Sequence, residues 1–213
     1  MTAKTRYLLV GVFYMVFALS SALTSGCASD SYAAKGAGEG AATGAVAGAV
    51  GGMVSALVFG GDVAEAGARG AVYGGTTGAV VGGIAGSKAD KAVAEQERAQ
   101  RDAELAELKN QIGTDAFNGV VALADCKHDL AIANAREAVK SGNSNYALAG
   151  VWVETLTEAD RQREPQARAL FPEIVRRDRD IKSEADAEAQ MNTSLRELGN
   201  IRVEYGMAAV CSA

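Results

Sequence analysis

Two runs of glycine at every fourth position constrain this chain more than any other feature of its sequence. The first run spans residues 36–52 and the second spans residues 70–86. A spacing of four places the glycines of each run on one face of a helix, where a second backbone can approach closely. Each glycine costs a helix about 0.5–1 kcal/mol relative to alanine, so the pattern predicts compensating close packing. The glycines expected to pack helices are Gly36, Gly40, Gly44, Gly48, Gly52, Gly70, Gly74, Gly78, Gly82 and Gly86.

The residues between the two runs predict a helical hairpin over residues 36–87. Gly60 and Gly61 are expected to end the first helix, and Asp62 is expected to cap the second. Residues 40–61 carry no charge over 22 positions. As a helix this stretch would span about 33 Å, which is enough to cross a bilayer. A helix that is apolar on all sides is buried in protein or in lipid, so we expect the hairpin to associate with a membrane or with copies of itself.

Two other interpretations of the glycine-rich region stay open. One is a water-soluble zipper that is buried only against its own copies. The other is a disordered tract of glycine and alanine, which the strict spacing and the frequent valines disfavour.

Residues 1–26 have the pattern of an export signal. Lys4 and Arg6 precede an uncharged stretch that contains the apolar run YLLVGVFYMVFAL. These residues are therefore not expected to contribute to the fold. A plain secretory signal or an uncleaved anchor helix, each with an incidental cysteine after it, is the alternative to the lipoprotein signal described next.

The five residues LTSGC, which end at Cys27, resemble the lipobox of bacterial lipoproteins, although Thr24 stands where that family usually has leucine. The resemblance implies that Cys27 becomes the lipidated first residue of the mature protein, with palmitate as an expected acyl group. Ala28 resembles the pattern that sends such proteins to the outer membrane. Residues 27–35 would then form a tether between the lipid and the hairpin.

The remaining cysteines suit an exported protein. With Cys27 lipidated, Cys126 and Cys211 are left as a pair in an oxidising compartment, where they are expected to form a disulfide. On the chain-entropy argument a loop of this length constrains the unfolded chain by about 4–5 kcal/mol. Two buried thiols are the alternative.

Charge argues against nucleic acid as a partner. The formal net charge of −5 includes Lys4 and Arg6, so the rest of the chain carries −7. Acidic and basic residues are interspersed along it, as on the surfaces of solvated helices.

The glycine runs and the charged helix after them also resemble a known family. Residues 36–112, which end in SKADKAVAEQERAQRDAELAELKNQ and Ile112, look like the glycine-zipper (YMGG-like) region of bacterial outer-membrane lipoproteins. The resemblance implies a protein in the cell envelope that faces the periplasm, with membrane lipid, its own copies and an unidentified envelope protein as partners. Some members continue into an OmpA-like peptidoglycan-binding domain. Here NTSLRELG has Gly199 in place of the arginine that this domain requires, and strand patterns are missing after residue 90.

The second half of the chain predicts an all-α fold. Residues 88–112 are expected to form a linker helix, and residues 113–213 a small helical bundle closed by the disulfide. One faint resemblance to a tetratricopeptide repeat has no second copy in register. The expected helices run from Thr114 to about Ala138, from Tyr146 to Glu164, from Pro172 to about Leu198, and from about Asn200 to near Cys211.

Candidate chemistry is sparse in this half. His128 is the only histidine and lies near Cys126, but a structural role is favoured because no metal-ligand or general-base spacing accompanies it. Glu154, Glu158 and Glu164 are expected on a solvated face. The sequence therefore predicts no catalytic residue, metal site or cofactor, and it argues against an enzyme.

Three functional hypotheses follow from these patterns. The first is a structural or interaction lipoprotein, held to the outer membrane through Cys27, that presents its helical bundle to a partner. The second is a pore-forming or membrane-permeabilising protein, because tandem glycine zippers also occur in peptides that assemble in bilayers. A third, an enzyme or peptidoglycan binder, has no residue in its favour.

Overall fold

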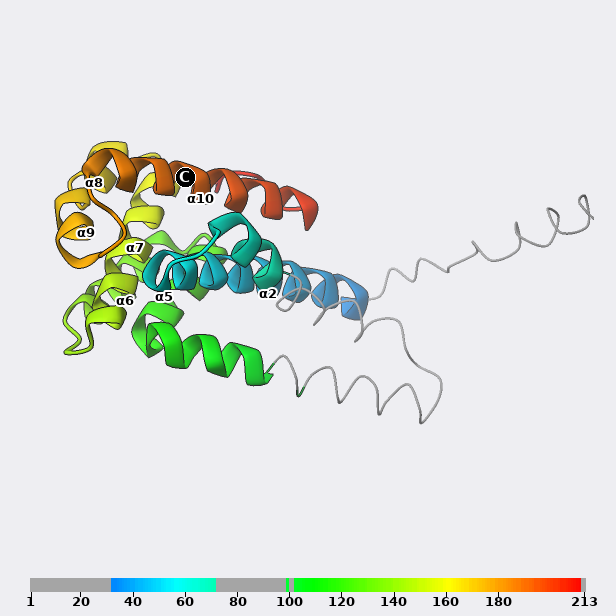
Figure 1. The fold of residues 1–213 in the computed structure, drawn as a ribbon. Coiled ribbons are helices and arrows are strands. Elements are labelled where there is room, and N and C mark those ends of the chain that lie inside the picture. Colours follow the sequence, from blue (N-terminus) through cyan, green and yellow to red (C-terminus); the bar gives the residue numbers. More distant parts are fainter. Residues whose placement is uncertain (1–31, 72–98, 100–101, 212–213) are drawn as a thin grey trace, which may run out of the picture.

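The structure, a computed structural model, describes residues 32–71, 99 and 102–211, with side chains from residue 44 onward in these ranges. Every regular element in these ranges is an α-helix, which confirms the predicted all-α fold class (Figure 1). Residues 63–71 and 102–112 are helical. The other helices are α2 (Tyr32–Phe59), α5 (Thr114–Ala124), α6 (His128–Val139), α7 (Ser144–Asp160), α8 (Glu164–Arg168), α9 (Phe171–Arg177) and α10 (Glu184–Glu204).

Helix α2 lies in the middle of the molecule. Figure 1 shows α10 along one side of it and helical residues 102–112 along another. Helix α2 also contacts α5 and α7. Its large apolar residues are buried in the same core as those of the later helices, and these residues are Val46, Val50, Met53, Val54 and Leu57.

This arrangement differs from the expected division into a hairpin over 36–87 and a separate bundle over 113–213. Helices α5, α7 and α10 cover the apolar side chains of α2, so these side chains contact other parts of the protein. The first glycine-rich helix and the C-terminal helices thus share one core. In the part of the chain that the structure describes, no helix is long and apolar enough to cross a membrane.

The turn after α2 follows the sequence prediction. Gly60 and Gly61 have φ angles of +80° and +146°, a region that side chains disfavour. The Oδ1 of Asp62 then accepts a hydrogen bond from the backbone N–H of Glu65 at 2.9 Å, which caps the helix over 63–71. The chain reverses here and returns along α2.

The two helices of this hairpin meet backbone to backbone. A Cβ atom on Gly52 would overlap the carbonyl oxygen of Ala66, and one on Gly70 would overlap that of Gly48. A side chain would not fit at either crossing, so glycines of both runs pack the helices of one chain together. Gly36, Gly40 and Gly44 also belong to α2. Gly74, Gly78, Gly82 and Gly86 lie outside the described residues.

The helix expected from Thr114 to about Ala138 is interrupted in the structure. Asp125, Cys126 and Lys127 form a turn between α5 and α6, and Cys126 has a φ angle of +59°. The turn is closed by the N–H of Lys127, which donates to the carbonyl oxygen of Ala122 at 2.8 Å. Apolar spacing continues through this turn, so periodicity alone predicts one helix.

The C-terminal helices also differ from the expected ones. Helix α9 ends at Arg177, because Asp178 is extended and its Oδ1 accepts from the N–H of Asp180 at 2.8 Å. Ser183 then caps α10. Helix α10 continues past Asn200 without a break to Glu204, so the helix predicted from Asn200 to Cys211 is wrong.

The residues after α10 form a short tail without helical structure. Gly206 has a φ angle of +74°, and the chain turns back along the bundle. Cys211, the last residue that the structure describes, lies beside the turn between α5 and α6.

Candidate functional site

Three segments far apart in the sequence meet at one end of the bundle. There the turn after α5, the start of α6, the end of α7 and the tail surround a pocket of about 680 Å³. We call it the disulfide pocket. Its lining residues are Cys126, Lys127, His128, Asp129, Leu130, Asp160, Arg161, Gln162, Arg163 and Cys211.

The predicted disulfide forms one wall of this pocket. Cys126 and Cys211 are bonded, with their Cα atoms 5.7 Å apart and 85 positions between them in sequence. The bond joins the turn after α5 to the tail, and Cys211 is buried. Since neither residue belongs to a helix, the bond ties together two segments that helical packing alone would not hold.

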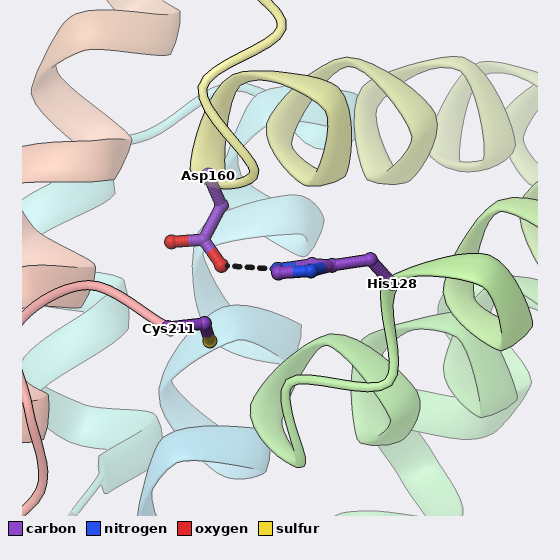
Figure 2. A group of neighbouring side chains, drawn as sticks. All are labelled: His128, Asp160 and Cys211. Atoms are coloured by element: carbon purple, nitrogen blue, oxygen red, sulfur yellow. Dashed lines mark hydrogen bonds and ion pairs between the residues drawn. The ribbon is translucent and has the colours of Figure 1, made fainter. Parts of the chain in front are cut away.

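A histidine–carboxylate pair lies beside the disulfide. The Nε2 of His128, at the start of α6, is 2.9 Å from the Oδ2 of Asp160, at the end of α7 (Figure 2). Both side chains are largely buried, with exposed fractions of 12% and 5%. The only histidine of the chain therefore has a buried hydrogen-bond partner, as the structural interpretation of His128 expects. Figure 2 also shows the sulfur of Cys211 close to the pair.

A buried arginine completes this cluster. The side chain of Arg202, on α10, is fully buried and donates to both carboxylate oxygens of Asp160, at 2.6 and 3.0 Å. It also donates to the carbonyl oxygens of Leu123 at 3.3 Å and Ala209 at 3.5 Å. The guanidinium therefore links α10 to α7, to the end of α5 and to the tail. Two opposite charges in such a site stabilise the fold only as a pair, because either one alone would be buried without compensation.

Sequence reasoning missed both Asp160 and Arg202. One signal for Arg202 was present, since it lies four positions after Leu198 and next to Ile201, on the apolar stripe of α10. An arginine on a buried stripe requires an acidic partner. Asp160 carries no comparable signal, because an aspartate at the end of a helix is usually exposed.

The expected solvated face is wrong for two of the three glutamates that were predicted to form it. Glu154 and Glu158 are buried, because α7 is surrounded along most of its length by other helices. The Oε1 of Glu154 accepts from the Nε of Arg136 at 2.8 Å. Glu164, by contrast, is exposed and pairs with Arg168 at 2.7 Å.

The remaining predicted site residue is Cys27, the expected lipidation site. It lies outside the described residues, so the structure does not bear on it. The disulfide is the predicted site that the structure brings together, and it does so beside a histidine and a carboxylate.

Comparisons with known proteins assign no family. No family model matches the chain, and neither a curated protein nor a solved structure is similar to it. The possible chemistry of the pocket must therefore be inferred from its residues. Aspartate can orient histidine as a general base, yet the described residues that line the pocket include no hydroxyl group to activate. The arrangement suits holding the tail, the turn and two helix ends together.

Proposed function

We propose that this protein is an exported lipoprotein of the bacterial outer membrane that acts as a structural or interaction module in the periplasm. The observation that carries the proposal is the disulfide between Cys126 and Cys211 in a chain whose only other cysteine, Cys27, ends a lipobox-like sequence. Disulfides persist in oxidising compartments such as the periplasm. An export signal, a lipid site and a paired set of remaining cysteines all agree with the same location.

Lipid on Cys27 is the proposed means of attachment to the membrane. Burial of the α2 side chains Val46, Val50 and Met53 in the protein's own core supports this, because those groups are then unavailable to lipid. Close packing of Gly48 against Gly70 within one chain also supports attachment through the lipid rather than through these helices. The bundle would then lie in the aqueous periplasm, where it can contact an envelope partner.

Cell fractionation tests the lipid anchor. We expect wild-type protein to remain in membranes washed with carbonate and to incorporate labelled palmitate. A Cys27→Ala variant should incorporate none and should be released into the soluble periplasmic fraction once its signal is removed. Ser25→Ala is the matched control, because it changes a neighbouring small residue and keeps the cysteine. If the processed Cys27→Ala protein resists the wash, another part of the chain is inserted in the bilayer and the proposed attachment is wrong.

A further inference from the structure

The disulfide pocket brings together more metal-binding groups than a structural cross-link needs. The Sγ of Cys211, a ring nitrogen of His128 and a carboxylate oxygen of Asp160 all lie within 4.8 Å of one another (Figure 2). The Sγ of Cys126 is bonded to that of Cys211 and therefore lies directly beside this cluster. We propose that reduction of the disulfide converts this cluster into a zinc site with Cys126, Cys211, His128 and Asp160 as its four ligands.

The ligand types and their number fit zinc. Structural Zn²⁺ sites hold four ligands in a tetrahedron, at about 2.3 Å for thiolate sulfur and about 2.0–2.2 Å for imidazole nitrogen and carboxylate oxygen. Neighbouring ligand atoms in such a tetrahedron lie roughly 3–4 Å apart. The atoms of Cys211, His128 and Asp160 are therefore already near the separations that the ion requires, whereas the two sulfur atoms must move apart from bonding distance.

The backbone around the ligands allows that adjustment. Cys126 lies in a turn and Cys211 in the tail, so both can move without breaking a helix. His128 and Asp160 lie at the first position of α6 and the last of α7, where they are already held toward each other at 2.9 Å. Two fixed ligands and two adaptable ones can form a site once the sulfur–sulfur bond is broken.

The reaction balances with a dithiol as reductant. The dithiol gives two electrons and two protons and becomes a disulfide, while Cys126 and Cys211 become two thiols. Binding of Zn²⁺ then releases the two thiol protons and forms two zinc–sulfur bonds. The carboxylate and the neutral imidazole contribute electron pairs and lose no proton to the solvent, because the proton that Nε2 of His128 donates to Asp160 moves to Nδ1 when Nε2 binds the metal.

Charge also favours this exchange. In the oxidised protein the buried charges of Arg202 and Asp160 cancel. Zn²⁺ and two thiolates add no net charge, so reduction and metal binding leave the net charge of the cluster unchanged. Arg202 donates to the Oδ1 of Asp160 at 2.6 Å and can keep that bond while Oδ2, which lies beside His128 and also accepts from Arg202 at 3.0 Å, turns to the metal. Such a partner behind a ligating carboxylate orients it.

Cobalt binding tests the proposal directly. The full chain carrying Cys27→Ser, so that no third thiol is present, is reduced with a phosphine and titrated with Co²⁺ and then Zn²⁺. We expect one Co²⁺ per chain, with the visible bands of tetrahedral cobalt and a thiolate-to-cobalt charge-transfer band, both displaced by Zn²⁺. The same protein without reductant should show neither band. Far-UV circular dichroism on each sample reports whether the helices persist.

Variants separate the four-ligand site from the two thiols alone. His128→Gln and Asp160→Asn should each weaken binding of Zn²⁺ by more than about 100-fold, since even loss of a group behind a ligand costs 10–100-fold. Asp129→Asn, a change to an exposed carboxylate of the same pocket, should leave the affinity unchanged. If both ligand variants bind as tightly as the parent, the thiols act alone and the proposed site is wrong.

Two further results would overturn the proposal. One is reduced protein that keeps its helices and gives no thiolate-to-cobalt band. The other is reduced protein that loses its helices and does not regain them when Zn²⁺ is added, because the four ligands meet only in the folded bundle.

Discussion

At the scale of single residues, Arg202 has the most connected environment of the site. Its guanidinium is fully buried and bonds the carboxylate of Asp160 and two backbone carbonyl oxygens. These bonds reach three other segments of the chain. Asp160 in turn holds His128, so one buried ion pair sets the positions of most groups beside the disulfide.

Removing one member of this pair should be costly. We expect Arg202→Met to lower the free energy of unfolding by about 3–5 kcal/mol, because the carboxylate of Asp160 is left buried without its counter-charge. Urea denaturation followed by circular dichroism measures the loss. Lys140→Met is the matched control, since it breaks an exposed pair with Glu137, and it should cost about 0–1 kcal/mol.

A double variant checks the reason for that loss. Arg202→Met combined with Asp160→Asn should cost less than the sum of the two single changes, because each single change leaves one charge unpaired. Strictly additive costs would mean that the two side chains do not act as a pair.

At the scale of helices, the glycine runs act through the contact between α2 and the helix over 63–71. The carbonyl oxygens of Ala66 and Gly48 occupy the space that Cβ atoms on Gly52 and Gly70 would need. The close approach is therefore a property of both backbones together. It repeats after four residues on each helix, as the spacing of the glycines requires.

A single methyl group at this crossing should destabilise the fold. We expect Gly52→Ala to lower the free energy of unfolding by about 1–3 kcal/mol, because the helices must move apart to admit it. Gly142→Ala is the control, since a Cβ there has no heavy atom within 4 Å, and it should be neutral or slightly stabilising. The loss at Gly52 should not vary with protein concentration, as measured by thermal unfolding over a wide dilution range. A loss that grows on dilution would instead indicate a contact between copies.

Helix type was predictable from the sequence, but several helix ends and the partner of α2 were not. The glycine pair and Asp62 predicted the first turn because each residue has a local geometric role there. The interruptions between helices at Cys126 and at Asp178 contain no glycine or proline, and they do not disturb the apolar spacing from which helices are predicted. They depend on a disulfide and on side-chain to backbone bonds that form only in the folded chain.

The candidate site was predictable only in part. The cysteine pair followed from counting cysteines in an exported chain. The ion pair of Asp160 and Arg202 joins residues 42 positions apart, and no local pattern indicates such a contact.

At the scale of the whole molecule, one core includes helices from both ends of the described chain. Helix α2 contacts α10, and the disulfide joins the turn after α5 to the tail. The fold therefore joins distant parts of the sequence in addition to packing neighbouring helices against each other.

Loss of the disulfide should weaken this closure. We expect the double variant Cys126→Ser and Cys211→Ser to unfold with a free energy about 2–5 kcal/mol lower than that of the parent, because the unfolded chain regains the freedom of a long loop. Urea denaturation of both proteins without reductant gives the difference. Adding reductant and a metal chelator should bring the parent close to the variant, and an unchanged gap would show that the serines, not the lost bond, cause the effect.

The central position of α2 also has a consequence for the order in which the chain can fold. Ribosomes add about 5–20 residues per second, and α10 follows α2 by more than 120 residues. Synthesis of α10, the last helix that covers α2, is therefore completed on the order of ten seconds after that of α2. Until then the part of α2 that α10 covers is exposed to water, so the incomplete chain is the form that most needs a holding chaperone.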